Sequence, residues 1–156
     1  MEYSAHRLMN TQDAINLRNE ILAKDSWVDG KLSAGGEAKK VKSNEELRGD
    51  KLGLDIIRKL FNDRQVRSYA IPKVIHNVMF SRSAKGKGYG LHFDNSYMGD
   101  YRCDLSFTLF LSEPSDYEGG QLSLEIAPER REIKLSAGEM IIYPTKFLHE
   151  VKKVTD

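Results

Sequence analysis

One segment, residues 104–112, constrains the fold of this chain most. Its sequence DLSFTLFLS alternates strictly between two sets of side chains, which are Leu105, Phe107, Leu109 and Leu111 on one side and Ser106, Thr108, Phe110 and Ser112 on the other. A repeat of two residues is typical of a β-strand whose two faces meet different surroundings. We expect the leucine-rich face in a core, while the more polar face suits a strand that lines a cavity.

Other short segments after residue 70 also have strand character. Residues 71–80 are rich in β-branched and apolar side chains, and the sequence EPSDYEGG at 113–120 has the composition of a turn. Further strands are expected at 122–126, 133–135, 140–143 and 148–154. Many short strands that follow two helices predict an α+β fold with an antiparallel sandwich or barrel.

The two helices are expected in the first part of the chain. Residues 11–24 have apolar side chains at helical spacing, and Asn10 or Thr11 can cap the start of this helix. A second helix is expected at 44–63. The glycine- and lysine-rich stretch between them, 29–44, is predicted to be a mobile surface loop. Its lysines are expected in solvent: Lys39, Lys40 and Lys42.

The composition limits size and partners. The 156 residues suffice for one domain, 1–156, with a helical support region at 1–70 and a β core at 71–156. A net charge of +1 gives no electrostatic case for binding nucleic acid or an anionic membrane. The single cysteine, Cys103, excludes a disulfide framework. Because no apolar run is long enough for a signal peptide or membrane span, we expect a cytoplasmic protein.

A histidine–carboxylate constellation is the main chemical feature. His92 and Asp94 lie two residues apart in GLHFDN, so that extended backbone turns both side chains to the same side. His149 lies beyond several predicted strands, which are enough to return the chain beside its start. Two histidines and one carboxylate leave positions open on a metal, as in non-haem Fe(II) oxygenases. Two alternatives stay open: zinc binds the same ligands, and a His-x-Asp pair also occurs in hydrogen-bonded loops.

Three longer stretches carry a family resemblance. They are WVDGKLSAGGEAKKVKSNEEL (27–47), GYGLHFDNSYMGDYRCDLSFTLFLSEPSDYEGGQLSLE (88–125) and LSAGEMIIYPTKFLHEV (135–151). Together they resemble the PKHD-type hydroxylases, a family of prolyl-4-hydroxylase-like Fe(II)/2-oxoglutarate dioxygenases. The resemblance implies a double-stranded β-helix (jelly-roll, cupin-like) core with N-terminal helices on one face. It also implies that His92, Asp94 and His149 are the iron ligands.

The resemblance further implies a reaction. Iron, 2-oxoglutarate and O₂ would hydroxylate a C–H bond of a peptidyl side chain or a small molecule, with succinate and CO₂ as co-products. A dependence on ascorbate is expected as well. Thr108 and Phe110 would line the 2-oxoglutarate site, although a threonine also suits a strand without such a role. Tyr89 and Arg102 would contact the substrate, and the alternatives are a core tyrosine and a salt bridge from Arg102 to Asp104.

The sequence departs from the family pattern at two places. In the family, an arginine for the distal carboxylate of 2-oxoglutarate lies further beyond the second metal histidine than the seven residues that follow His149 here. A tyrosine near the keto-acid pocket is replaced by Ser83. We therefore expect a C-terminally truncated domain without its final strand, and the alternative function is a non-catalytic module that binds a metal or a partner. An exposed sheet edge at 148–154 would favour a homodimer.

Overall fold

The structure is a computed structural model that describes residues 2–49 and 51–156. Its α-helices are α1 Thr11–Leu22, α2 Gly36–Lys40, α3 Lys51–Asn62 and α4 Arg64–Ala70, and its 3₁₀ helices are η1 Gly30–Leu32 and η2 Pro114–Asp116. Its strands are β1 Ser4–Arg7, β2 Val28–Asp29, β3 Glu45–Leu47, β4 Phe80–Arg82, β5 Tyr89–His92, β6 Tyr97–Met98, β7 Tyr101–Arg102, β8 Leu105–Leu109, β9 Leu122–Ile126, β10 Glu129–Ile133, β11 Glu139–Pro144 and β12 His149–Val151. The fold is therefore mixed α+β, as predicted.

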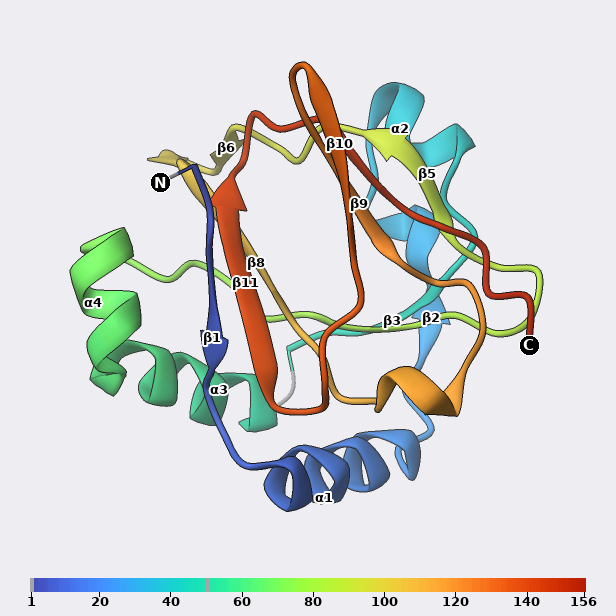
Figure 1. Ribbon diagram of the computed structural model, residues 1–156, viewed down its shortest axis with the longest axis horizontal. Helices are drawn as coiled ribbons and strands as arrows, with labels where there is room; N and C mark the ends of the chain where they lie inside the picture. Colours follow the sequence, from blue (N-terminus) through green and yellow to red (C-terminus); the bar gives the residue numbers. More distant parts are fainter. Residues whose placement is uncertain (1, 50) are drawn as a thin grey trace.

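Two antiparallel sheets form the centre of the molecule (Figure 1). One has the strand order β1-β11-β8, and the other has the order β10-β9-β12-β5. A smaller sheet, β2-β3-β4, and the hairpin β6-β7 complete the strands of the described residues. Strands that are distant in sequence therefore become neighbours, and β12 returns beside β5 as the histidine spacing required.

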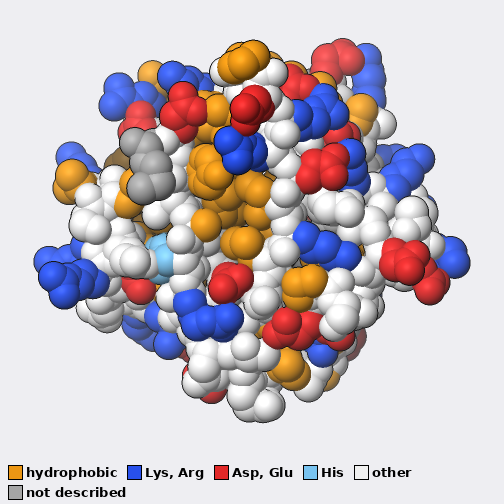
Figure 2. Space-filling view, in the orientation of Figure 1, with side chains coloured by type: hydrophobic (Ala, Val, Ile, Leu, Met, Phe, Trp, Pro, Cys, Tyr) orange, Lys and Arg blue, Asp and Glu red, His pale blue; other side chains and the backbone are white. Residues whose placement is uncertain are grey.

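Strand β11 separates two cores because its alternate side chains point to opposite faces. Met140 and Ile142 pack with the helices α1, α3 and α4 in the first core. Ile141 and Tyr143 belong to the second core, which lies between the two large sheets and includes Leu122 and Leu124. Figure 2 shows hydrophobic side chains gathered between β11 and β9, with charged side chains around them. The N-terminal helices thus cover one face of the first sheet, as predicted.

The expected alternation at 104–112 is confirmed. The side chains of Leu105, Phe107, Leu109 and Leu111 all pack against the first core, and Phe110 packs against the second. Helix α1 is confirmed as well, since the Asn10 side chain accepts a hydrogen bond of 2.8 Å from the backbone N–H of Asp13. These segments formed as expected because their pattern matches the faces that they bury.

The predictions for residues 29–63 need correction. The expected loop contains η1 and α2, and the expected second helix begins only at Lys51, because residues 45–47 form strand β3. Residue 50 lies outside the described residues. Lys42 was expected in solvent but is only 3% exposed, since it pairs with the buried Glu46. An acidic sequence can form a buried strand here because a neighbouring cation neutralises it.

The expected strand at 71–80 is also wrong. Only Phe80 of that stretch lies in a strand, β4, and residues 71–79 are irregular. Ile71 adopts a left-handed conformation with φ 45° and is 80% exposed. Ile75 and Val78 nevertheless pack against the first core. The apolar composition thus reflects scattered anchoring contacts rather than a hydrogen-bonded ladder.

Strand β12 does not form an exposed edge. It pairs with β9 on one side and with β5 on the other, so it lies inside its sheet. Val154 makes further bridges to Lys85 and Gly119. The edge argument for a homodimer is therefore wrong, because the backbone groups of residues 149–151 already have partners. Within the described residues, no helix has the length and apolar character needed to cross a membrane.

Candidate metal centre

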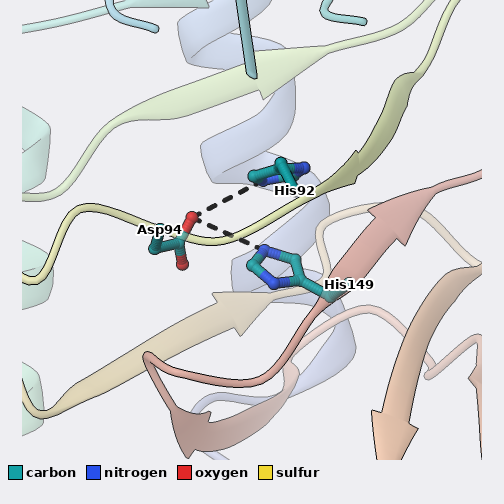
Figure 3. Close-up of side chains that lie close together, drawn as sticks. All are labelled: His92, Asp94 and His149. Carbon is teal, nitrogen blue, oxygen red and sulfur yellow. Dashed lines mark ion pairs between the residues drawn. The ribbon is translucent and has the colours of Figure 1, made fainter. Parts of the chain in front are cut away.

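Three side chains converge where β5 ends and β12 begins. His92 is the last residue of β5, His149 is the first residue of β12, and the two are directly opposed in the antiparallel register. Asp94 follows β5 after one residue and turns towards both rings (Figure 3). Its Oδ1 atom lies 3.6 Å from His92 Nε2 and 3.5 Å from His149 Nε2. The structure thus brings together the three residues that the sequence selected.

Backbone carbonyls fix the orientation of both imidazoles. His92 Nδ1 lies 2.6 Å from the carbonyl oxygen of Gly90, and His149 Nδ1 lies 2.9 Å from that of Phe147. A carbonyl oxygen can only accept a hydrogen bond, so each Nδ1 carries the proton and donates it. In the neutral imidazole this leaves the Nε2 lone pair free, and Nε2 is the atom that faces Asp94. Both rings are therefore oriented as metal ligands.

The electrostatics couple Asp94 to the two histidines. Burial alone would raise the pKa of Asp94, but its contacts with His149, His92 and Ser106 outweigh burial and hold that pKa well below its usual range. Burial alone would lower the pKa of His149, yet the Asp94 carboxylate and the Phe147 carbonyl outweigh it and raise that pKa. The carboxylate is thus kept ionised, which is the form that a cation binds.

The donor set fits a divalent transition metal. The three ligand atoms all lie within 4.8 Å of one another, and both histidines are buried while Asp94 is partly exposed. Two nitrogens and one oxygen suit Fe(II) and also zinc. Since three protein ligands do not fill the coordination sphere of Fe(II), further positions remain for small molecules. His92, Asp94 and His149 are therefore the residues that could hold such an ion.

A β-bulge brings Tyr89 onto His92, which the sequence did not reveal. In a regular strand, residues 89 and 92 point to opposite faces. Here His149 opposes His92 and Val151 opposes Tyr89, so two residue steps along β12 correspond to three along β5. The extra residue turns Tyr89 to the side of His92, and the rings stack with centroids 3.4 Å apart at 10°. The two adjacent glycines, Gly88 and Gly90, were the only signal of this irregularity.

A large cleft lies beside two of the three residues. Its volume is 1440 Å³, and His92 and Asp94 contribute to its wall. The four secondary residues named from the sequence line the same cleft: Tyr89, Arg102, Thr108 and Phe110. Arg102 also forms the expected ion pair with Asp104 at 2.8 Å, with both side chains largely exposed. The cleft therefore joins the candidate metal site to the inner face of β8.

Two further residues of this wall were not named as site residues by the sequence analysis, although it placed Ser106 on the face of its strand that suits a cavity. Tyr143 is buried on β11, hydrogen-bonds with Thr108, and makes a T-shaped ring contact with His149, with centroids 5.2 Å apart. Burial raises the pKa of Tyr143 above its ordinary value, so the phenol stays neutral. Ser106 hydrogen-bonds with Asp94 and lies 3.2 Å from the Thr145 hydroxyl. Strand pairing brings Ser106 opposite Tyr143, and no local sequence pattern indicates that pairing.

Comparison with known proteins agrees with this geometry. Residues 78–156 match the family model of the 2OG-Fe(II) oxygenase superfamily. A PKHD-type hydroxylase of Prochlorococcus marinus (strain SARG) is 47% identical over 161 residues, which cover 99% of this chain and 73% of that protein. A second one, from strain NATL1A of the same species, is 45% identical over 162 residues and covers 100% of this chain and 73% of that protein.

Solved structures show the same fold at low sequence identity. A Pseudomonas putida prolyl-4-hydroxylase superposes with a TM-score of 0.76 at 15% identity, covering 99% of this chain and 87% of that one. A Trichoplax adhaerens prolyl hydroxylase, solved with a peptide fragment of the hypoxia inducible factor oxygen degradation domain, gives a TM-score of 0.70 at 16% identity, covering 99% and 78%. The predicted jelly-roll core with flanking helices is thereby confirmed.

Proposed function

The chain belongs to the 2OG-Fe(II) oxygenase superfamily and is a dioxygenase of the hydroxylase type; on this premise we propose that His92, Asp94 and His149 bind its Fe(II) and that it hydroxylates a C–H bond of a peptidyl side chain or a small molecule. When bound, iron and 2-oxoglutarate would supply the oxidising chemistry, with succinate and CO₂ as co-products. The protein contributes binding, orientation and the exclusion of water.

One observation carries this proposal. The Nε2 atoms of His92 and His149 both face the same Asp94 oxygen, at 3.6 and 3.5 Å, at the wall of the cleft. Because each Nδ1 is held by a carbonyl, the two histidines are preorganised and need not rotate when an ion binds. The partly exposed Asp94 keeps one side of the centre open to small molecules.

The inner face of β8 supports a place for 2-oxoglutarate. We assign Thr108 and Phe110 to the wall that contacts this co-substrate, because both line the cleft shared with His92 and Asp94. The Thr108 hydroxyl, already hydrogen-bonded with Tyr143, offers a polar contact, while Phe110 offers an apolar one for the methylene groups. Such a mixture of one polar and several apolar groups is typical of small-molecule sites.

The substrate would enter over the exposed part of the cleft. We assign Arg102 to its recognition, because the guanidinium is exposed and its ion pair with Asp104 is a surface pair that costs little to break. The hydroxyl edge of Tyr89 is assigned to the same role. A dependence on ascorbate, which the family resemblance implies, and a cytoplasmic location, which the sequence composition led us to expect, complete the proposal.

Anaerobic titration tests the proposed function. Fe(II) and then 2-oxoglutarate are added to the whole chain, and we expect a visible charge-transfer band followed by succinate release on exposure to air. The control is the Asp94→Ala variant, which should give neither signal because the carboxylate ligand is gone. A folded chain that binds Fe(II) but shows no band and no succinate would instead be a metal-binding module without turnover.

A further inference from the structure

A buried charged cluster lies behind the candidate metal centre, on the side of Tyr89. Lys42 is 3% exposed and Glu46 is 0% exposed, and their side chains form a close ion pair. The Ser33 hydroxyl lies 2.7 Å from Lys42 Nζ and 2.8 Å from Glu46 Oε1. Arg48 Nε contacts the other oxygen, Glu46 Oε2, at 3.3 Å. We call these four residues the lysine cluster.

The Lys42 ammonium has one direction left after these contacts. An ammonium carries three N–H donors, and Glu46 and Ser33 accept two of them. The third direction is met by the ring of Tyr89, whose centroid lies 4.6 Å from Nζ. An ammonium over an aromatic ring is attracted to it, more strongly when both are shielded from water. The lysine cluster therefore contacts Tyr89 through the Lys42 ammonium.

Tyr89 in turn stacks on His92. The imidazole of His92 covers one face of the tyrosine ring at 3.4 Å, so the ammonium lies against the other face. The backbone fixes the same arrangement, because Lys42 bridges Tyr89 and the Gly90 N–H donates to the Val41 carbonyl at 2.9 Å. A side chain at residue 90 would meet Val41 Cβ at 2.8 Å, so only glycine allows this approach.

From this continuous stack we propose that Lys42, held by Glu46 and Ser33, is a positioning residue for the metal centre. Lys42 keeps Tyr89 stacked on His92 and so fixes the plane of that imidazole. This inference rests on the proposed function, in which His92 is a metal ligand. The Gly90 carbonyl holds one edge of the imidazole, and Tyr89 holds its face. Groups that orient a metal ligand from outside change metal affinity about 10–100-fold when removed.

A merely structural role for the lysine cluster makes a different prediction. If Lys42 only neutralises Glu46, the double variant Lys42→Met with Glu46→Gln removes both charges together and leaves His92 unaffected. If Lys42 positions Tyr89, the same neutral variant loses the contact to the ring. The matched control is Lys40→Met with Glu37→Gln, because that pair is exposed and touches no residue of the centre.

The first measurement uses the metal-free protein. Proton NMR of the His92 ring in the whole chain reports the stack, since a tyrosine face at 3.4 Å shifts the imidazole protons upfield. We expect the Lys42→Met/Glu46→Gln variant and Tyr89→Leu to lose this upfield shift, and Tyr89→Phe and the Lys40→Met/Glu37→Gln control to keep it. The proposal is overturned if the Lys42→Met/Glu46→Gln variant keeps the upfield shift while Tyr89→Leu loses it.

The second measurement is Co(II) affinity, followed by the visible spectrum of the ion. We expect about tenfold weaker binding in the Lys42→Met/Glu46→Gln variant and a similar loss in Tyr89→Leu, with Tyr89→Phe close to the wild type. A lost NMR shift with unchanged Co(II) affinity overturns the claim that Lys42 acts on the centre. If the wild type fails to bind Co(II), the proposed function fails, whereas the NMR result still decides what Lys42 does to His92.

Discussion

Two polar clusters lie on opposite sides of Tyr89, and they differ in how completely their groups are satisfied. In the lysine cluster, both Glu46 oxygens and the Lys42 ammonium have partners inside the protein. At the metal centre, the Nε2 atoms of His92 and His149 face only Asp94 among the residues that the structure describes, at 3.5–3.6 Å, which is longer than a good hydrogen bond. A cluster whose polar groups all have protein partners stabilises the fold, whereas a cluster whose polar groups lack close partners can bind a ligand.

Burial follows the same division. Lys42 and Glu46 of the lysine cluster are shielded from water, and their ion pair is costly to break because each partner would remain buried alone. Asp94 instead keeps 34% of its side chain exposed, so that its charge can meet a cation from the cleft. The same residue types, a carboxylate beside a basic group, therefore serve two purposes according to their access to solvent.

The largest expected effect is the loss of metal affinity when a ligand is removed from the metal centre. His149→Ala removes one nitrogen ligand, so metal binding should fall by more than the about 10–100-fold that follows the loss of an indirect contact. Equilibrium dialysis with Fe(II) under anaerobic conditions measures this loss. His76→Ala is the control, because His76 is exposed and lies outside the three-residue centre. Unchanged affinity in His149→Ala would refute the ligand assignment.

The next largest effect is the loss of stability when the buried ion pair of the lysine cluster is broken. Glu46→Ala leaves the Lys42 ammonium buried without its carboxylate, which should lower the free energy of unfolding by about 3–5 kcal/mol. Glu37→Ala removes the carboxylate of an exposed lysine pair and should cost about 0–1 kcal/mol. Urea unfolding of both variants provides the measurement. Equal losses in the two variants would show that burial does not distinguish the pairs.

A smaller effect depends on pH and sharpens the comparison at the metal centre. The raised pKa of His149 adds stability that is fully present below about pH 6.5 and is lost as the pH rises through the folded value. The lowered pKa of Asp94 adds stability that is present above about pH 3.9 and is lost as the pH falls towards the folded value. With a chelator present, wild type should therefore exceed Asp94→Asn most between about pH 4 and 6.5.

The size of this advantage is limited by solvent. Asp94 is partly exposed, so we expect at most about 1 kcal/mol, measured as the difference in thermal unfolding between the two proteins at pH 5.5 and at alkaline pH. All other titrating groups are common to both proteins and cancel. A difference that stays constant over this range, or grows with pH, would contradict the coupling between Asp94 and His149.

The smallest effect concerns the outer edge of the lysine cluster. Arg48→Gln removes a cation that is 42% exposed, so the free energy of unfolding should fall by less than about 0.5 kcal/mol. Glu46 would keep its contacts with Lys42 and Ser33. Urea unfolding is again the measurement. A loss as large as that of Glu46→Ala would mean that Arg48, rather than Lys42, neutralises the buried carboxylate.

The contrast between the two clusters also explains what the sequence could predict. The metal residues could be found because His92 and Asp94 are close in sequence and because the alternation at 104–112 identified the surrounding strands. Lys42 was expected in solvent because charged residues are usually exposed, and Glu46 fell within the expected helix at 44–63. Only the tertiary structure places strand β3 between β2 and β4 and thereby buries Glu46.

Backbone irregularities also limit what can be predicted from the sequence. A repeat of two residues predicts which side chains share a face, but a bulge changes that assignment after a single residue. The stack of Tyr89 on His92 therefore could not be inferred from spacing, although the glycines around Tyr89 indicated an unusual backbone. The irregular path of 71–79 escaped prediction for a related reason: β-branched composition does not specify that a partner strand is available.

The bulge in β5 also has a consequence for how this region tolerates changes in length. Deleting one residue between Tyr89 and His92 would restore a regular ladder with β12, and the tyrosine, then two residues from the histidine, would stay on the same face. The residue removed would be Gly90 or Leu91, and Gly90 supplies the carbonyl that holds His92 Nδ1 and the N–H that donates to the Val41 carbonyl. The bulge therefore makes room in β5 for a glycine that orients the metal ligand, and losing that glycine would change the setting of His92 although Gly90 itself binds no ion.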